Sequence, residues 1–230
     1  MLKLEHTVVA NGAFELEANL EIPTGAKVAV IGPSGAGKST LIGAIAGFME
    51  AKRGRILWNE REIQDANPGD RPVSMLFQDG NLFPHLSIRD NVSLGISPRL
   101  ALTAEQRARV GEALARVGLA DLGVRKPAAL SGGQQSRAAL ARVLVQSRPL
   151  ILLDEPFSAL GPALKREMLA LVGELADESG ATLMMVTHDP EDARLLTDSA
   201  ILVAEGVAHP PEPTDRLFAN PPPALKAYLG

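Results

Sequence analysis

A glycine-rich stretch, Gly32-Pro-Ser-Gly-Ala-Gly-Lys-Ser-Thr40, follows one aliphatic run and precedes a helical pattern. It has the spacing G-x-x-x-x-G-K-[ST], in which backbone N–H groups cradle phosphate oxygens, and the helix N-terminus behind it adds partial positive charge. We expect Lys38 to reach the β- and γ-phosphates of a nucleotide and the Ser39 hydroxyl to bind Mg²⁺. The alternative, a glycine-rich turn that contains a lysine by chance, is disfavoured by the strand before it and the helix after it. The expected nucleotide-binding residues here are Gly32, Pro33, Ser34, Gly35, Ala36, Gly37, Lys38, Ser39 and Thr40.

Two acids, Asp154 and Glu155, end a second aliphatic run at 150–153. At the carboxyl end of a strand both side chains lie at the sheet edge where α/β proteins bind ligands. We expect Asp154 to hold Mg²⁺ through water and Glu155 to polarise an attacking water. An acid pair that merely caps a helix beside Pro156 is the alternative, and the phosphate loop in the same chain makes it the weaker one.

The segment Leu130-Ser-Gly-Gly-Gln134 places two glycines in the first turn of a predicted helix. Each glycine there costs roughly 1 kcal/mol relative to alanine, and no local structural purpose for them is visible in the sequence. We therefore expect an anion site of bare backbone N–H groups and the Ser131 hydroxyl; the alternative is a flexible turn with an ordinary cap. Because a γ-phosphate needs donors from two sides, we assign this segment to the same function as the phosphate loop. The residues expected to take part are Ser131, Gly132, Gly133 and Gln134.

Short aliphatic runs alternate with longer helical patterns on both sides of a helical middle. This alternation predicts a largely parallel sheet with helices on its faces. The expected strands are 27–31, 55–58, 73–77, 150–153, 182–186 and 200–204, and the expected helices are 39–49, 162–179 and 191–196.

From about Arg89 to Gln146 no strand pattern occurs. Capping boxes of the form S/T-x-x-Q begin at Thr103 and Ser131 and predict helices over 104–117 and from 131 to about 146. We expect a nucleotide-binding α/β core of residues 1–88 and 147–230, into which a helical subdomain, 89–146, is inserted. The proline-rich tail predicts an irregular excursion that ends in a short helix at 224–229.

Composition excludes several classes of protein. With 46% hydrophobic residues the 230-residue chain is not disordered, and 23 basic against 27 acidic residues argue against a free-standing nucleic-acid binder. There is no cysteine, which excludes disulfides and thiolate metal sites, and the four histidines are scattered. No apolar run approaches the ~20 residues of a membrane helix, and the N-terminus has no signal pattern. We expect a cytoplasmic protein that can dock on a membrane protein.

In order and spacing, Gly32–Thr40, Gln78, Leu130–Gln134, Leu150–Glu155 and His188 resemble the ATP-binding cassette (ABC) ATPases over essentially the whole chain. The Ser-Gly-Gly-Gln element separates these proteins from other P-loop NTPases. The resemblance implies an α/β fold, in which a P-loop core carries an N-terminal antiparallel β portion and an inserted helical subdomain. It also implies two copies that sandwich two ATP molecules head to tail, with the P-loop of one copy facing Ser131–Gln134 of the other.

The resemblance also assigns roles to residues that say little by themselves. Gln78 would sense the γ-phosphate, Mg²⁺ and water and would open the loop that touches a membrane partner. Glu155 would be the general base, and His188 would contact the γ-phosphate. Taken alone, Gln78 would be a surface amide and His188 an ordinary imidazole at the end of a strand.

A finer resemblance, to the ATPase subunits of bacterial thiamine importers, rests on 71–79, 81–83, 85–86, 150–162 apart from one position, and the total length. It implies a membrane permease as partner, a periplasmic substrate-binding protein as indirect partner, no nucleic acid, and a peripheral location at the cytoplasmic face of the inner membrane. The alternatives are importer ATPases for iron, sulfate, molybdate or polyamine, and non-transport ABC ATPases, which need coiled coils or two cassettes. A P-loop kinase would lack Leu130–Gln134.

The chain departs from the family pattern at two places. Relatives carry Asp where this chain has Gly161, and they carry an adenine-stacking aromatic where this chain has Val9 to Asn11. The nearest aromatic is Phe14, whose alternation with Leu16 predicts a place in the core.

Overall fold

The computed structural model describes residues 1–78, 80–158 and 160–229. Asp79 and Ala159, which belong to the segments that carry the resemblance, lie outside the described residues.

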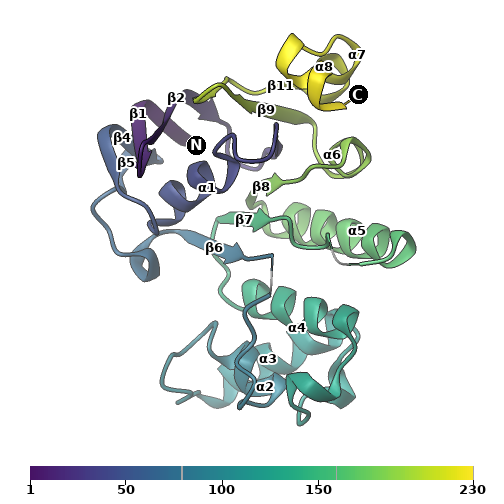
Figure 1. Ribbon diagram of the computed structural model, residues 1–230. Helices are drawn as coiled ribbons and strands as arrows, with labels where there is room; N and C mark the ends of the chain where they lie inside the picture. The colour runs from purple at the N-terminus through teal and green to yellow at the C-terminus, as the bar shows by residue number, and fades with distance from the viewer. Residues whose placement is uncertain (79, 159, 230) are drawn as a thin grey trace.

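One half of the sheet is antiparallel and comes mainly from the N-terminus (Figure 1). Along β2, alternate residues from Leu16 to Ile22 are buried while those between them are exposed, the period of a strand with one face on a core. The strands of this half are β1 (Leu2–Asn11), β2 (Phe14–Ile22), β4 (Ala51–Trp58), β5 (Arg61–Glu62) and β10 (Val207–Ala208), the last pairing with β2 in parallel.

The other half is parallel, as the alternation of runs predicts. Its order is β9 (Ser199–Ala204), β3 (Lys27–Ile31), β8 (Thr182–Val186), β7 (Leu150–Asp154) and β6 (Val73–Leu76), with the short β11 (Glu212–Pro213) antiparallel on β9. Its strands are buried aliphatic runs because helices cover both faces. In β7, Leu150 and Leu152 belong to the core cluster that contains α1 (Lys38–Ala46), while Ile151 and Leu153 belong to the cluster that contains α5 (Pro162–Ser179).

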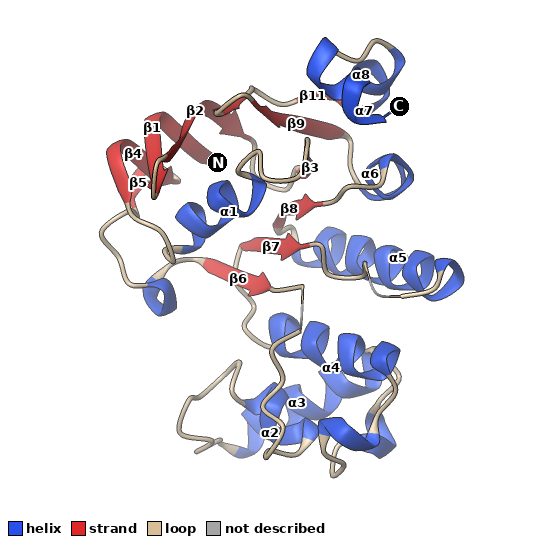
Figure 2. Cartoon of the chain, in the orientation of Figure 1, coloured by secondary structure: helices blue, strands red, loops and turns tan. Residues whose placement is uncertain are grey.

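Residues 89–146, all of them described, contain no strand, as expected (Figure 2). The segment holds most of α2 (Ile88–Ser93), then α3 (Ala104–Arg116), the 3₁₀ turns η2 (Ala120–Leu122) and η3 (Pro127–Ala129), and α4 (Gly132–Leu144). Both capping boxes are confirmed, at Thr103 with Gln106 and at Ser131 with Gln134. A further 3₁₀ turn, η1 (Pro68–Asp70), precedes β6.

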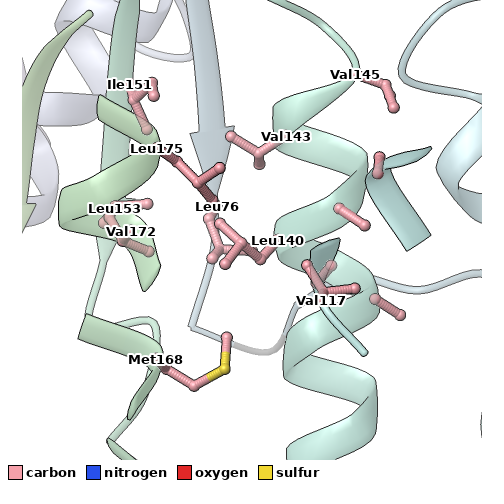
Figure 3. Close-up of a cluster of buried hydrophobic side chains, with 14 of the residues drawn as sticks. Leu76, Val117, Leu140, Val143, Val145, Ile151, Leu153, Met168, Val172 and Leu175 are labelled. Atoms are coloured by element: carbon pink, nitrogen blue, oxygen red, sulfur yellow. The ribbon is translucent and has the colours of Figure 1, made fainter. Parts of the chain in front are cut away.

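The helical segment is not packed separately from the sheet. Figure 3 shows Leu140 and Val143 of α4 meeting Leu76 of β6, with Val172 of α5 on the far side of the same cluster. A movement of α4 would therefore shift the side chains packed against it at the ends of β6 and β7.

The tail corrects one expectation. The region expected to be irregular contains β11 and a helix, α7 (Thr214–Ala219), before the expected short helix, α8 (Pro223–Leu229). The reason is tertiary: Leu217 and Phe218 are buried in a third cluster, and the Arg194 guanidinium of α6 (Pro190–Leu196) lies 5.0 Å from the centroid of the Phe218 ring. The first helix is also shorter than expected, because Gly47 adopts φ 90° and ends it.

Arg71 closes the end of α1. Its guanidinium is buried and donates to the carbonyl oxygens of Ala44 and Ile45 at 2.7 and 2.9 Å, and also to those of Ala66 and Gln64. Burial lowers the pKa of Arg71 from its usual value.

We expect Arg71→Met to lower the free energy of unfolding by roughly 3 kcal/mol, because buried carbonyls lose charged donors. Arg148→Met is the matched control, since Arg148 is exposed and donates to Gly69 O at 3.0 Å; its effect should stay below about 1 kcal/mol. Urea denaturation of the three proteins measures both. Equal midpoints for Arg71→Met and the wild type would contradict this account of α1.

Candidate active site

The parallel register brings four expected segments to one edge of the sheet. Val30 pairs with Val186 of β8, Val186 with Asp154 of β7, and Leu153 of β7 with Leu76 of β6. The residues that follow these strands include the glycine-rich loop, Glu155, His188 and Gln78. This is the carboxyl edge, where ligands of open α/β sheets bind.

Glycine is required at two points of the glycine-rich loop. Gly32 has φ 146°, and a Cβ there would lie 2.0 Å from the carbonyl oxygen of Val203. Gly37 has φ 104° at the start of α1 and would clash with the ring of Phe14. The loop is thus held close to its neighbours by residues without side chains, as a backbone anion cradle needs.

Lys38 is buried, and its ammonium donates to the carbonyl oxygens of Gly32 and Pro33, both at 2.9 Å. Burial lowers the pKa of Lys38, while the charges of Glu155 and Asp154 oppose that shift. A desolvated cation beside converging N–H groups attracts phosphate oxygens strongly.

Ser39 Oγ donates to Asp154 Oδ1 at 3.2 Å. Burial raises the pKa of Asp154; the hydrogen bond from Ser39 opposes the shift and the charge of Glu155 adds to it. Mg²⁺ takes hard oxygen ligands and is commonly held by one or two carboxylates together with phosphates, so this pair fits the ion. Among the described residues no group of three or more His, Asp or Glu side chains could hold a metal by itself.

Glu155 and His188 face each other, with Nδ1 of His188 3.4 Å from Oε2 of Glu155. Glu155 adopts φ 44°, a left-handed conformation that non-glycine residues rarely take, while its N–H donates to Val186 O at 3.1 Å. Such strain persists where the surroundings fix a side chain, typically at functional sites.

A lysine that no sequence pattern indicates lies near His188. Nζ of Lys165, on α5, lies 2.8 Å from Asp189 Oδ2 and 2.6 Å from Asp192 Oδ2, and Asp192 also accepts from Thr187 Oγ1 at 3.0 Å. These contacts fix the residues on either side of His188. No local pattern links position 165 to 189, so only an alignment or the fold could have revealed the pair.

A pocket of about 430 Å³ opens over the glycine-rich loop. Phe14 lines it and also packs, partly buried, against the core cluster that contains α1, so the expectation that this ring belongs to the core is confirmed in part. The alternation with Leu16 does place Phe14 on the inner face of β2, but at the end of the strand, where that face reaches the loop. The residues that line the pocket are Asn11, Phe14, Ser34, Gly35, Gly37, Lys38, Ser39, Thr40 and Glu155. A volume of several hundred Å³ suits a nucleotide.

Val9 is buried within the sheet, so it does not offer a site for a stacking aromatic. Gln78 is exposed and lies outside the lining of the pocket.

The Ser131–Gln134 segment begins α4 and is absent from the lining of the pocket. Ser131 Oγ accepts from Gln134 N at 3.3 Å, and Gln134 Oε1 accepts from Ser131 N at 3.0 Å. A Cβ on Gly132 would meet nothing within 4 Å, but one on Gly133 would lie 2.3 Å from Leu164 Cδ2. The expectation that neither glycine has a local structural purpose stands, and the contact of Gly133 is a tertiary one with the end of a leucine side chain on α5.

Comparison with known proteins shows the family. The family model described as ABC transporter matches residues 16–158. The chain belongs to the ABC transporter family. As an ABC cassette it binds ATP and is an ATPase.

Two curated relatives match along the full length. The thiamine import ATP-binding protein ThiQ of Cereibacter sphaeroides is 62% identical over 230 residues, covering 100% of both chains, and that of Ruegeria sp. TM1040 is 60% identical with the same coverage. Among solved structures, the dimeric post-hydrolysis state of the ATP-binding cassette MJ0796 bound to ADP and Pi has a TM-score of 0.81 at 32% identity, covering 93% of this chain and 99% of that one. The ABC cassette MJ1267 in its ADP conformation, at 24% identity, has a TM-score of 0.89 over 100% of this chain and 98% of its own, which supports the fold alone.

We expect Phe14→Ala to raise the KM for ATP about tenfold, because a base stacked on an aromatic ring is worth roughly 1–3 kcal/mol. The rate at saturation should change little, since the contact is equal in ground and transition states. ATPase titrations measure both constants. Phe48→Ala is the control, because Phe48 is exposed and does not line this pocket. If Asn11→Tyr lowers KM while Phe14→Ala does not change it, the base lies over Asn11 instead.

Proposed function

We propose that this chain is the ATP-hydrolysing subunit of a bacterial ABC importer for thiamine, peripheral to the cytoplasmic face of the inner membrane. Full-length identity of 62% to a thiamine import ATP-binding protein carries the proposal. No helix among the described residues has the length and hydrophobicity to cross a bilayer. Transport would then depend on a separate permease, with a periplasmic substrate-binding protein as indirect partner.

We propose two copies arranged head to tail around two ATP molecules. The separation of Ser131–Gln134 from the pocket over the glycine-rich loop supports this, since one chain alone does not bring its two anion-binding segments together. Each composite site would combine the pocket of one copy with the α4 N-terminus of the other. The helical subdomain, 89–146, would present that end, and 1–88 with 147–230 would form the core.

Within one such site, Lys38 and the backbone of Gly32–Thr40 would hold the phosphates. Glu155 would take a proton from the attacking water, and His188, fixed by the Lys165 contacts, would orient toward the γ-phosphate. Ser39, Asp154 and Gln78 would hold Mg²⁺, which when bound neutralises charge on the phosphates.

A groove of about 300 Å³ beside Gln78 supports contact with the permease. Phe48 and Phe83 line it and are 56% and 46% exposed, and the ring of Phe77, next to Gln78, lies 5.5 Å from that of Phe48 between centroids, tilted by 60°. Exposed aromatics on a single chain favour burial by a partner, and here the partner would touch the loop that carries Gln78.

The test is ATP-dependent uptake of labelled thiamine by cells that express the chain together with the permease encoded beside it. Uptake that requires both genes and is lost in Glu155→Gln supports the proposal. Uptake of iron, sulfate, molybdate or a polyamine in place of thiamine would assign the chain to another importer. ATPase activity with no permease partner would favour a non-transport role.

Gly161 is the N-cap of α5, has no side-chain cap, and has open space around the position of a Cβ. We expect Gly161→Asp to change the free energy of unfolding by only a few tenths of a kcal/mol and to raise ATPase activity in the presence of the permease, because relatives carry Asp here. Gly111→Asp serves as a control, since Gly111 is exposed on α3 and also has open space around the position of a Cβ. Equal activity of Gly161→Asp and the wild type would make the departure neutral.

A further inference from the structure

Arg142 lies on α4, three turns after Ser131. Its Nη1 donates to Asn81 O and its Nη2 to Gly80 O, both at 2.7 Å. Arg142 forms no ion pair with a carboxylate of the described residues. Its guanidinium interacts with these two carbonyl oxygens instead. The Arg142 side chain is partly buried, and this burial lowers its pKa from the usual value.

The two carbonyls belong to the turn that contains Gln78. The Gly80 N–H donates to Phe77 O at 2.9 Å and so closes this turn around Gln78. Gly80 and Asn81 both adopt left-handed conformations, with φ 64° and 46°. A Cβ on Gly80 would lie 3.2 Å from that of Ala139, so the turn also packs tightly against α4.

A second anchor holds the chain just beyond this turn. Asn91 is fully buried in α2, accepts from Phe83 N at 2.7 Å, and donates to the carbonyl oxygens of Phe83 and Ser87 at 3.1 and 2.9 Å. The helical segment therefore hydrogen-bonds to the loop after β6 at two places, through Arg142 and through Asn91. Among the side chains that the structure describes, Arg142 is the one that hydrogen-bonds to the loop next to Gln78.

We propose that Arg142 is a positioning residue: it fastens the Gln78 turn to α4, so that the turn moves with the Ser131 end of the same helix. This rests on the proposed role of Gln78 at the phosphates. A 13-residue helix is stiff and transmits a shift along its axis. In the proposed head-to-tail pair, α4 would therefore connect the ATP that Gln78 contacts in one composite site with the ATP that Ser131 contacts in the other.

A mutant cycle tests this. Arg142→Met should lower kcat about tenfold to a hundredfold, as misplacement of a catalytic group by an ångström does, with KM for ATP changed less than about twofold. Arg142→Lys keeps the charge and should recover part of the rate. The double variant Arg142→Met/Gln78→Ala should be no slower than Gln78→Ala alone, because Arg142 acts through Gln78.

Arg109→Met is the matched control, since Arg109 also donates from the helical segment to a carbonyl, that of Val145 at 2.8 Å, but does not contact the turn. Its kcat should stay near the wild-type value even if its melting temperature falls. Amide exchange followed by mass spectrometry should accelerate in peptides over 77–84 for Arg142→Met only.

Additive losses in the double variant, or a wild-type kcat in folded Arg142→Met, would overturn the proposal. If Arg142→Met does not fold, the same cycle with Arg142→Lys decides. A wild-type chain without ATPase activity would instead defeat the proposed function, which keeps the two failures apart.

Discussion

Glu155→Gln should reduce kcat for ATP hydrolysis by about 10²–10⁴-fold, the usual contribution of a general base. The amide keeps the shape of the side chain but does not accept a proton. Binding of ATP should persist, because Lys38 and the glycine-rich loop are untouched. With hydrolysis blocked, Mg-ATP should hold two copies together, and sedimentation velocity with and without Mg-ATP measures that shift from monomer to dimer.

Glu205→Gln is the matched control for this experiment. Glu205 also has a left-handed backbone, φ 52°, and lies outside the pocket, so any effect of the amide on such a backbone appears there as well. A Glu155→Gln protein that hydrolyses ATP near the wild-type rate would remove Glu155 from the role of base. The nearest titratable neighbour, His188, would then be the next candidate.

Many of the strands and helices are predictable because their signals lie in the local sequence. The strands Lys27–Ile31 and Thr182–Val186 and the helix Pro162–Ser179 have their predicted bounds. A buried parallel strand is a short aliphatic run, and a helix start is marked by its cap. The nucleotide-binding loop is likewise predicted by a motif that carries its own context, whereas the antiparallel N-terminal portion is expected from the family resemblance alone.

What escaped prediction depends on contacts between distant residues. Alternation along β2 predicts that Phe14 packs on the core, which it does, but not that the same ring also lines the pocket over the glycine-rich loop. Helix propensity counts Gly133 as a loss, because it takes no account of Leu164 on the neighbouring helix. Lys165 and Arg142 are ordinary helix residues by sequence, and only the fold shows that one fixes the His188 segment and the other the Gln78 turn.

Ser131→Arg should abolish most ATP hydrolysis, with kcat reduced about a hundredfold, while the isolated chain still binds ATP with unchanged affinity. In the proposed head-to-tail pair Ser131 serves the pocket of the other copy, where loss of a positioned donor typically costs 10²–10³ in rate and the larger side chain would separate the two copies. Equilibrium binding to the monomer and steady-state hydrolysis measure the two effects separately.

Part of the effect of Ser131→Arg comes from loss of the α4 helix cap, and a control must measure that part separately. Thr103→Arg is the control, because Thr103 forms the same capping box with Gln106 on α3, and each change should cost about 1 kcal/mol of stability. Mixing then tests the geometry. In a head-to-tail pair of one Ser131→Arg chain and one Glu155→Gln chain, both lesions fall in one composite site and the other site is intact. Activity should therefore recover above that of either variant alone; no recovery, or loss of ATP binding by the Ser131→Arg monomer, would mean that Ser131 serves its own chain.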